Sequence, residues 1–240
     1  MTKNDLYPKN FILNNLPEKT LSRYKKELEK VEMSLTQLLY QPWSKVSHVY
    51  FPETSVISVV STLENGSGVE TGIIGKEGIL GATSIFAEEM SLGEATVQLG
   101  GEGWRMNIAA FKEFFEVDAE FRKIILAYVF TFIEQITQNS LCLCYHGIEK
   151  RLARWLLMLD DRTKDKKLVL TQEFLAQMLG VHRASVNKCA NKLQNMNLIS
   201  YVRGVIKILD REGLEDFACE CYRTITEIEN LSAKSEVLSK

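Results

Sequence analysis

The chain has 240 residues, of which 29 are Lys or Arg, 31 are Asp or Glu, and 45% are hydrophobic. This composition is ordinary for a globular protein of one or two domains, and it excludes a disordered chain, a collagen and a filamentous coiled coil. No apolar run reaches the roughly 18 residues of a membrane span, and the N-terminal residues lack the apolar segment of a signal peptide. We therefore expect a cytoplasmic protein without a membrane partner. The five cysteines are an odd number, and a reducing compartment would keep them as thiols.

Charge is concentrated in one segment. Residues 162–207 hold nine basic and two acidic side chains, a local balance of +7 (9 − 2), whereas the whole chain carries a net charge of −2. An internal basic block of this kind is typical of a module that binds a polyanion. A lysine-rich solvated surface would give the same charge, so the pattern of the surrounding residues must distinguish between these two interpretations.

The first half of the chain predicts a β-rich domain after an amphipathic helix at 18–30. Short apolar and β-branched segments occupy 46–51, 56–63, 69–74, 95–99 and 104–108, and most of the 14 glycines lie between 66 and 103. Strand-length segments separated by glycine turns indicate a compact antiparallel sandwich or barrel. The fold class expected for the whole chain is α+β.

Residues 111–145 contain neither Gly nor Pro and predict one long helix. One apolar stripe follows Phe121, Ile125, Tyr128, Phe132 and Ile136, and a second apolar stripe covers an adjacent face. A helix that is apolar on more than one face needs a second surface to cover it. We expect the helix to pack on the barrel and on the same helix of a second copy, with those five residues at the contact, giving a twofold homodimer. The alternative is a helix buried within one chain.

Residues 171–188 have the pattern of a helix-turn-helix. Thr171 can cap the first helix, and Gly180 allows the left-handed conformation that ends it. In the second helix Val186, Cys189, Ala190 and Leu193 follow the i, i+3, i+4, i+7 spacing of an inward face. Two short strands at 198–202 and 205–209 flank Arg203-Gly204 and predict a wing.

The outward face of the second helix is short, polar and basic, as a helix in the DNA major groove requires. Arg183 could bind a guanine edge, while Ser185, Lys188 and Lys192 could bind phosphates or a base. The alternative is a helical hairpin that only packs. The residues expected to contact DNA are Thr171, Gln172, His182, Arg183, Ala184, Ser185, Asn187, Lys188, Asn191, Lys192 and Arg203.

Residues 149–214 resemble the DNA-binding half of the bacterial CRP/FNR family, named after the cyclic-AMP receptor protein and the fumarate-nitrate regulator. The matching motifs are Arg151-Leu152-Ala153, Leu170-Thr171-Gln172-Glu173, Leu175-Ala176, Leu179-Gly180 and the wing. The resemblance implies a jelly-roll barrel like that of cyclic-nucleotide-binding domains at 1–110, a dimerisation helix at 111–146 and a winged helix-turn-helix at 147–240. It also implies promoter DNA, a second copy and RNA polymerase as partners.

The chain departs from the family in its recognition helix. The family motif there is Ser-Arg-Glu-Thr-Val-x-Arg, and residues 182–188 retain the Arg as Arg183 and a small hydroxyl as Ser185. The family's Glu, which accepts a hydrogen bond from cytosine, is Ala184 in this chain. Lys188 keeps the positive charge of the family's last Arg without its bidentate fork. We therefore expect a half-site that differs from the family's usual one.

The barrel departs from the family at its effector pocket. Ala82 stands where the family's Gly-Glu pair has its Glu, and Gly93-Glu94 stand where an Arg-Ser or Arg-Thr pair holds the cyclic phosphate. Because a carboxylate repels a phosphate, tight binding of cyclic AMP is not expected, and the effector is unknown. By resemblance the pocket residues are Gly81, Ala82, Thr83, Glu94, Ala95, Tyr128 and Phe132.

Metal binding and catalysis find little support in the sequence. No Cys precedes residue 142, which excludes the N-terminal iron-sulfur cluster of some family members. Possible haem ligands are His48, Cys142, Cys144 and His146. Residues i and i+2 of a helix diverge by roughly 200°, so neither Cys142 with Cys144 nor Cys219 with Cys221 is expected to share a metal.

We therefore predict buried thiols and no metal site. No phosphate loop, zinc-protease motif or nucleophile elbow is present, so an enzyme is not expected. Two alternatives remain beside a transcription regulator with an effector-sensing barrel. They are a haem- or redox-sensing regulator, and a small-molecule-binding module whose C-terminal domain is only structural.

Overall fold

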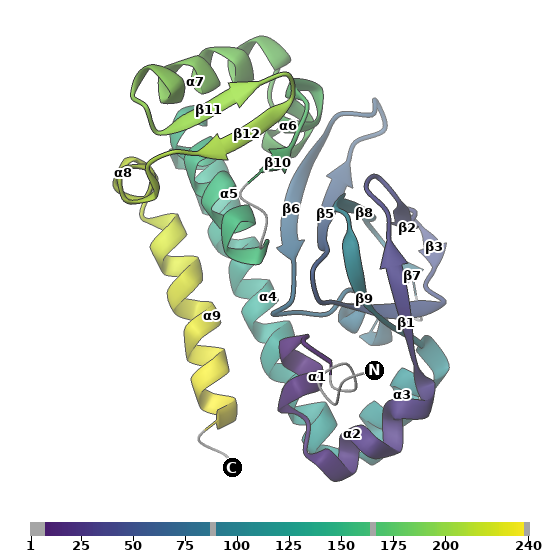
Figure 1. Cartoon of the computed structure of the whole chain (residues 1–240). Coiled ribbons are helices and arrows are strands. Elements are labelled where there is room, and N and C mark those ends of the chain that lie inside the picture. The colour runs from purple at the N-terminus through teal and green to yellow at the C-terminus, as the bar shows by residue number, and fades with distance from the viewer. Residues whose placement is uncertain (1–7, 87–89, 164–166, 238–240) are drawn as a thin grey trace. The chain divides into compact units, whose positions relative to one another are not determined.

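A computed structural model describes residues 8–86, 90–163 and 167–237 of the chain, with side chains up to residue 230 (Figure 1). Within these residues the chain divides into two compact units. The first comprises 8–59, 73–133 and 229–237, and the second comprises 60–72 and 134–228. The long helix and one strand pair each contribute residues to both units.

The N-terminal part of the chain contains short helices and nine strands among its described residues. Its elements are α1 (Phe11–Asn15), α2 (Glu18–Tyr24), the 3-10 turn η2 (Lys25–Glu27), β1 (Leu28–Met33), β2 (Leu38–Tyr40), β3 (Ser44–Lys45), β4 (His48–Pro52), β5 (Val56–Thr62), β6 (Gly68–Ile74), η3 (Ala82–Phe86), β7 (Met90–Ser91), β8 (Glu94–Leu99) and β9 (Gly101–Asn107). The helix expected at 18–30 ends at Tyr24, and residue 28 already begins a strand that pairs with β9. The strands expected in this half are confirmed to within a few residues.

The strands form three small sheets of jelly-roll type, with strand orders β1-β9-β4, β2-β8-β5-β6 and β3-β7. The pairings of β9 with β1 and β4, of β2 with β8 and of β3 with β7 are antiparallel. The expected antiparallel jelly roll is confirmed, whereas a closed barrel is not formed by the described strands. The α+β class is also confirmed.

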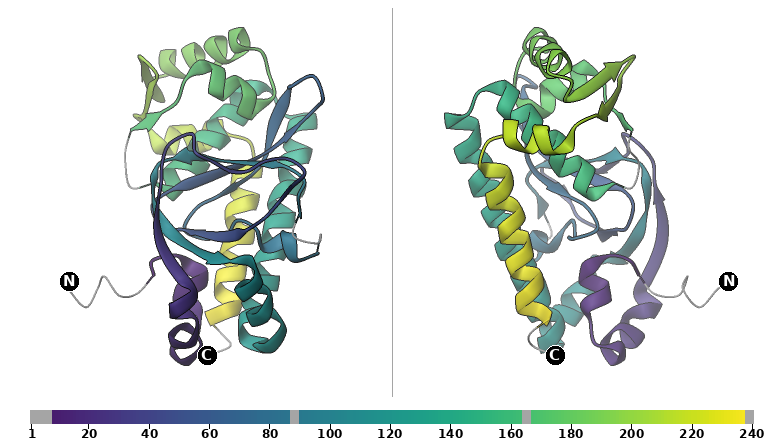
Figure 2. Two further views of the ribbon diagram at one scale, coloured as in Figure 1. Left: turned by 90° about the vertical axis from the view of Figure 1, so that its right-hand side faces the viewer. Right: turned by 60° about the vertical axis from the view of Figure 1, so that its left-hand side comes forward.

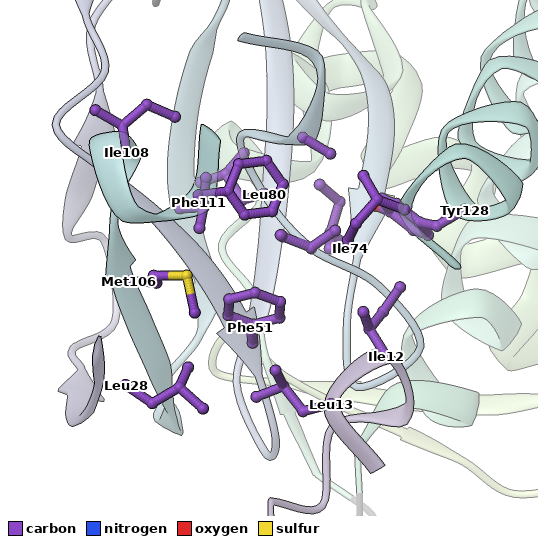
Figure 3. Packing of buried hydrophobic residues seen from close by; sticks show 14 of the residues in the cluster. Ile12, Leu13, Leu28, Phe51, Ile74, Leu80, Met106, Ile108, Phe111 and Tyr128 are labelled. Atoms are coloured by element: carbon purple, nitrogen blue, oxygen red, sulfur yellow. The ribbon is translucent and has the colours of Figure 1, made fainter. Parts of the chain in front are cut away.

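The core of the first unit lies between the sheets and the helices that follow them (Figure 3). Phe51 and Phe111 are fully buried, and the ring of Phe111 meets that of Phe121 edge-on at 5.4 Å between centroids. The Tyr128 ring lies so close to Gly78 that a Cβ there would approach it to 2.6 Å. Burying large aromatic side chains in this way supplies much of the free energy that holds α3 and α4 to the sheets.

The single helix expected over 111–145 is two helices, α3 (Ile108–Val117) and α4 (Ala119–Tyr145). Asp118 separates them, because its carboxylate accepts hydrogen bonds from the backbone N–H groups of Glu120 and Phe121, both at 3.0 Å. An Asp in that role caps a new helix instead of continuing the old one. The same carboxylate accepts a hydrogen bond from the Tyr24 hydroxyl at 2.6 Å.

The C-terminal part begins with α5 (Ile148–Arg162) and β10 (Leu168–Val169) and continues with α6 (Gln172–Leu179), α7 (Arg183–Asn195), β11 (Ile199–Val202), β12 (Val205–Ile208), α8 (Arg211–Phe217) and α9 (Cys221–Val237). The three strands form an antiparallel sheet in the order β10-β12-β11. The β11–β12 hairpin packs beside α7 (Figure 2). This is the expected winged helix-turn-helix.

Buried arginines hold the second unit together. Arg151 on α5 donates a hydrogen bond to the carbonyl of Leu179, in the last turn of α6. Arg154 donates to Asn139 Oδ1 at 2.6 Å and so joins α5 to α4. Both side chains are less than 8% exposed, so each anchors α5 from inside the unit. Of the helices in the described part of the chain, none combines the length and apolarity that crossing a bilayer would need.

Candidate nucleic-acid interface

The first helix of the motif, α6, has the ends that its sequence predicts. Thr171 Oγ1 accepts a hydrogen bond from the backbone N–H of Phe174 at 3.1 Å. At the other end Gly180 adopts φ 61° and ψ 43°, which a residue with a side chain rarely does. Leu175 and Leu179 are buried, so α6 is fixed by its inner face and presents its N-terminus to solvent.

The second helix, α7, separates its faces as its periodicity predicts. Val186, Cys189, Ala190 and Leu193 are all buried. The outward side chains at 182, 183, 184, 187, 188, 191 and 192 are exposed, and Ser185 is half-buried. Helical spacing puts Arg183 and Lys188 on the outer side with two short amides, a surface that fits a groove lined by base edges.

The outward side chains are ordered by hydrogen bonds to one another. Gln172 Oε1 accepts from Arg183 Nε at 3.3 Å, and Gln172 Nε2 donates to Asn187 Oδ1 at 3.2 Å. Asn187 Oδ1 also accepts from Asn191 Nδ2 at 3.4 Å. These exposed contacts link the start of α6 to the outer face of α7 and leave the other Arg183 nitrogens available to an incoming group.

The wing turns at Arg203 and Gly204, which both have positive φ, 51° and 78°. Two consecutive left-handed residues between paired strands make a tight two-residue hairpin turn. Leu170 N–H donates to the Gly204 carbonyl at 2.7 Å, and the Tyr201 hydroxyl donates to the Leu170 carbonyl at 2.8 Å. Burial raises the pKa of Tyr201 above its usual value, so its hydroxyl keeps the proton that it donates.

A cleft of about 600 Å³ lies between the wing and the N-terminus of α6. Its lining includes two guanidinium side chains, Arg183 and Arg203, and one carboxylate, Glu173, together with Thr171 and Gln172. A helix N-terminus with free N–H groups and nearby cations attracts anions. Because the two cations outnumber the carboxylate, the balance of charge in the cleft favours a phosphate.

Two of the predicted contact residues, Lys192 and His182, are exposed but differ in their contacts within the chain. Lys192 Nζ lies 2.9 Å from Glu149 Oε1 and over the Phe217 ring, so its charge is already partnered within the unit. His182 occupies the N-cap position of α7, but its side chain makes no capping hydrogen bond with a described residue. Lys164 and Lys166 of the basic block lie outside the described residues.

The residues expected at the effector pocket fall on η3, β8 and α4. Ala82 is buried, Thr83 is exposed, and Gly81 adopts φ 97° with the Tyr40 hydroxyl directly beside it. The Glu94 carboxylate accepts a hydrogen bond from Thr96 Oγ1 at 2.9 Å. On α4 the Tyr128 and Phe132 rings stack at 6.0 Å between centroids.

Most side chains of the apolar stripe expected at the dimer contact pack within their own chain. Phe121, Ile125 and Tyr128 are buried in the core of the first unit, and Phe132 and Ile136 are half-buried. Four exposed apolar side chains lie together on the neighbouring face of α4: Leu126 (44% exposed), Phe130 (60%), Ile133 (50%) and Leu141 (50%). Tyr145, at the end of the helix, is exposed as well.

The structure brings together four residues that were not expected to meet. The ligand atoms of Cys142, His146, Cys219 and Cys221 all lie within 4.8 Å of one another. Cys144 is exposed and outside the group, as its divergence from Cys142 predicts. The divergence argument fails for Cys219 and Cys221, because α9 begins only at Cys221 and Cys219 precedes it. The i, i+4 spacing of Cys142 and His146 was the signal that could have suggested a shared face.

In a comparison with models of protein families, residues 150–217 match the Crp-like helix-turn-helix domain. No curated protein matches the chain.

Solved structures match nearly the whole chain at low identity. A protein from Eubacterium rectale assigned to the crp/fnr family of transcriptional regulators has a TM-score of 0.69 at 15% identity, covering 86% of this chain and 96% of its own. FixK2 from Bradyrhizobium japonicum has a TM-score of 0.66 at 12% identity, with 80% and 98% covered. The c-di-GMP responsive global regulator CLP of Xanthomonas campestris has a TM-score of 0.64 at 14% identity, with 80% and 99% covered. At these identities the likeness establishes the fold.

Proposed function

We propose that this chain binds promoter DNA as a homodimer and regulates transcription. The proposal is supported by the match of residues 150–217 to the Crp-like helix-turn-helix domain and by the likeness of the fold to a regulator of the crp/fnr family. The observation that carries this proposal is the outer face of α7, where Arg183 and Lys188 are exposed while the opposite face is buried. Such a regulator acts in the cytoplasm, where the bacterial chromosome lies, and it has no need of catalytic chemistry.

The contacts on DNA follow from the positions of the cations. Arg183, at the N-terminal end of α7, has the geometry to hold a guanine edge with two parallel hydrogen bonds. Arg203 and the N-terminus of α6 line the cleft that suits a backbone phosphate. Two copies related by a twofold axis would read half-sites about 34 Å apart in successive turns of the duplex.

The dimer is proposed to form through the exposed face of α4 that contains Leu126, Phe130, Ile133 and Leu141. These residues lie on one side of a helix at spacings of four, three and eight. An apolar stripe of this kind along a long helix is the usual seam of a two-helix contact. Contact with RNA polymerase is a further expectation from the family.

The test is fluorescence anisotropy with DNA from upstream of the chain's own gene, titrated at two salt concentrations. We expect salt-dependent binding that weakens sharply when Arg183 and Lys188 are changed to Ala together, with a flatter salt slope. Lys45→Ala, at an exposed lysine on β3, is the matched control for loss of charge and should bind as the unmodified chain does. Equal affinities and slopes for the double variant and the control would refute the proposed DNA interface.

The effector of the proposed regulator is not cyclic AMP. The similar protein of Xanthomonas campestris is described as responsive to c-di-GMP, so this fold is not tied to one effector. In this chain Gly93-Glu94 stand where the family's Arg-Ser or Arg-Thr pair holds the cyclic phosphate, so a guanidinium is missing there and a carboxylate is added. Buried Ala82 cannot bind a ribose hydroxyl. Isothermal titration with cyclic AMP should give no heat of tight binding. DNA binding that appears only with cyclic AMP would show that other residues hold the phosphate.

A further inference from the structure

The cluster of Cys142, His146, Cys219 and Cys221 lies where α4 ends and α9 begins, on both sides of the winged helix-turn-helix in sequence. The three thiols are at most 4% exposed, and the His146 side chain is 19% exposed. Cys142 Sγ lies 3.5 Å from Cys219 Sγ, and Cys221 Sγ lies 3.4 Å from His146 Nδ1. The three sulfurs and one imidazole nitrogen all lie within 4.8 Å of one another. Buried cysteines that serve only as small apolar side chains do not need to converge with a histidine nitrogen in this way.

We propose that these four residues bind one Zn²⁺ ion in a tetrahedral Cys₃His site. Around a tetrahedral zinc, with bonds of about 2.3 Å to sulfur and about 2.0 Å to nitrogen, two sulfurs lie about 3.8 Å apart and a sulfur and a nitrogen about 3.5 Å apart. The observed separations of 3.5 Å and 3.4 Å come close to those values before any ion draws the ligands into place. An iron-sulfur cluster needs some of its ligands spaced more widely, because they are divided between two or more irons.

The groups around the four ligands are those that a zinc site requires. His146 directs Nδ1 at the cluster while its Nε2 lies 3.3 Å from the Glu220 carboxylate, the arrangement that fixes the ring and its tautomer in zinc proteins. Gln138 Nε2 donates to Cys221 Sγ at 3.1 Å, as amides do to metal-bound thiolates. Both contacts hold a ligand side chain in position at the cluster.

Charge in the surroundings also fits an occupied site. Three thiolates and one Zn²⁺ have a net charge of −1, which is costly to bury without a compensating cation. Arg151 and Arg154 are both buried near these cysteines. The positive charge of Arg154 interacts electrostatically with Cys142, and a negative charge on Cys142 would interact with Arg151. The Nε atoms of both arginines have no hydrogen-bond acceptor among the described residues, so the guanidinium groups retain unused donors.

The site would join the two chain segments that border the DNA-binding domain. Cys142 lies in the last turn of α4 and His146 follows directly after that helix. Cys219 and Cys221 come from the junction of α8 and α9, and Cys219 is 77 residues beyond Cys142. Binding the ion releases the remaining thiol protons and closes this long loop, so the free energy of binding contributes to folding. The site therefore stabilises the second unit whether or not the unit binds DNA.

The experiment measures the zinc content of the whole chain, purified anaerobically in a reductant and dialysed against a weak chelator. We expect about one zinc ion per chain, and near-zero content for Cys142→Ser, Cys219→Ser and Cys221→Ser. The same chain provides matched controls in Cys144→Ser and Cys189→Ser, which should keep the full content. Glu220→Gln, which removes only the carboxylate behind His146, should weaken zinc affinity about tenfold.

A cobalt titration uses the unmodified chain, so its result does not depend on whether a variant folds. Co²⁺ added to the metal-free chain should produce the intense visible bands of a tetrahedral ion together with thiolate-to-cobalt charge-transfer absorption. The proposal is overturned if the reduced chain takes up no ion. A Cys142–Cys219 disulfide formed when that chain is then exposed to air, with dioxygen as the oxidant, would identify the pair as a redox couple instead. The proposal is equally overturned if zinc content is the same in Cys144→Ser and Cys142→Ser, which would mean adventitious binding. Neither result depends on DNA binding.

Discussion

Lys192 Nζ on α7 lies 2.9 Å from Glu149 Oε1 on α5, while Lys188, one turn earlier, is exposed. The pKa of Glu149 lies below its usual value because its own backbone N–H and then the Lys192 ammonium donate hydrogen bonds to the carboxylate. The two lysines on one helix therefore have different partners, and a phosphate would compete with Glu149 for Lys192 only.

The first prediction compares these two lysines. Lys188→Ala should weaken DNA binding and lower the salt slope by about one, as expected for one lost phosphate contact. Lys192→Ala should change DNA binding less and should lower the free energy of unfolding by about 0.5 kcal/mol, the size of an exposed ion pair. Anisotropy at several salt concentrations and urea denaturation measure the two quantities. If both variants lose the same affinity, the Glu149 contact does not hold in the complex.

The second prediction concerns Arg203 in the wing. A residue with a side chain at φ 51° costs roughly 1 kcal/mol, and Asn-Gly is the preferred pair for this turn. Arg203→Asn should therefore raise the free energy of unfolding by about 0.5 to 1 kcal/mol while it weakens DNA binding and flattens the salt slope. Urea denaturation and anisotropy on the same sample test both effects. A variant that is less stable, or that binds DNA unchanged, would contradict the role given to Arg203.

The third prediction tests the exposed face of α4. Phe130→Glu places a charge in the middle of the proposed helix contact, so the chain should become monomeric and its affinity for a two-half-site DNA should fall. Sedimentation equilibrium measures the oligomeric state. Phe86→Glu is the matched control, because Phe86 is equally exposed (61%) but belongs to η3 and not to the exposed face of α4. If the Phe130→Glu chain remains dimeric, the dimer contact does not lie on this face of α4.

The fourth prediction concerns Asp118, which caps α4 and binds the Tyr24 hydroxyl. Asp118→Ala should lower the free energy of unfolding by about 1 to 2 kcal/mol. Burial disfavours the charged carboxylate, but hydrogen bonds from Tyr24 and two backbone N–H groups outweigh it and lower the pKa of Asp118.

The lowered pKa of Asp118 sets the sign of the pH dependence. A carboxyl group whose pKa is lower in the folded state stabilises the fold above the unfolded pKa, about 3.9, and loses this contribution as pH falls through the folded value. The stability difference between the unmodified chain and Asp118→Ala should therefore be constant near neutral pH and shrink below about pH 4. Denaturation at several pH values measures it. A difference that grew on acidification would contradict the assignment.

The sequence by itself determined the features that depend on local geometry. Helical periodicity separated the buried Val186 and Leu193 from the exposed Arg183, and the cap residues Thr171 and Gly180 bounded α6, because both signals lie within a few residues of one another. The Arg203-Gly204 turn and the strands around it followed from the same short-range rules.

Only the tertiary structure decided which surfaces meet. Both apolar stripes of α4 satisfy the same periodicity, and the sheets determine that Phe121 is buried and Phe130 exposed. Asp118 bounds α4 through its own local capping bonds, whereas its contact with Tyr24, 94 residues away, depends on how the helices dock. Cys142 and Cys219 are 77 residues apart, and chain packing alone brings their sulfurs to 3.5 Å. Contacts between distant residues depend on how elements dock, which no local pattern records.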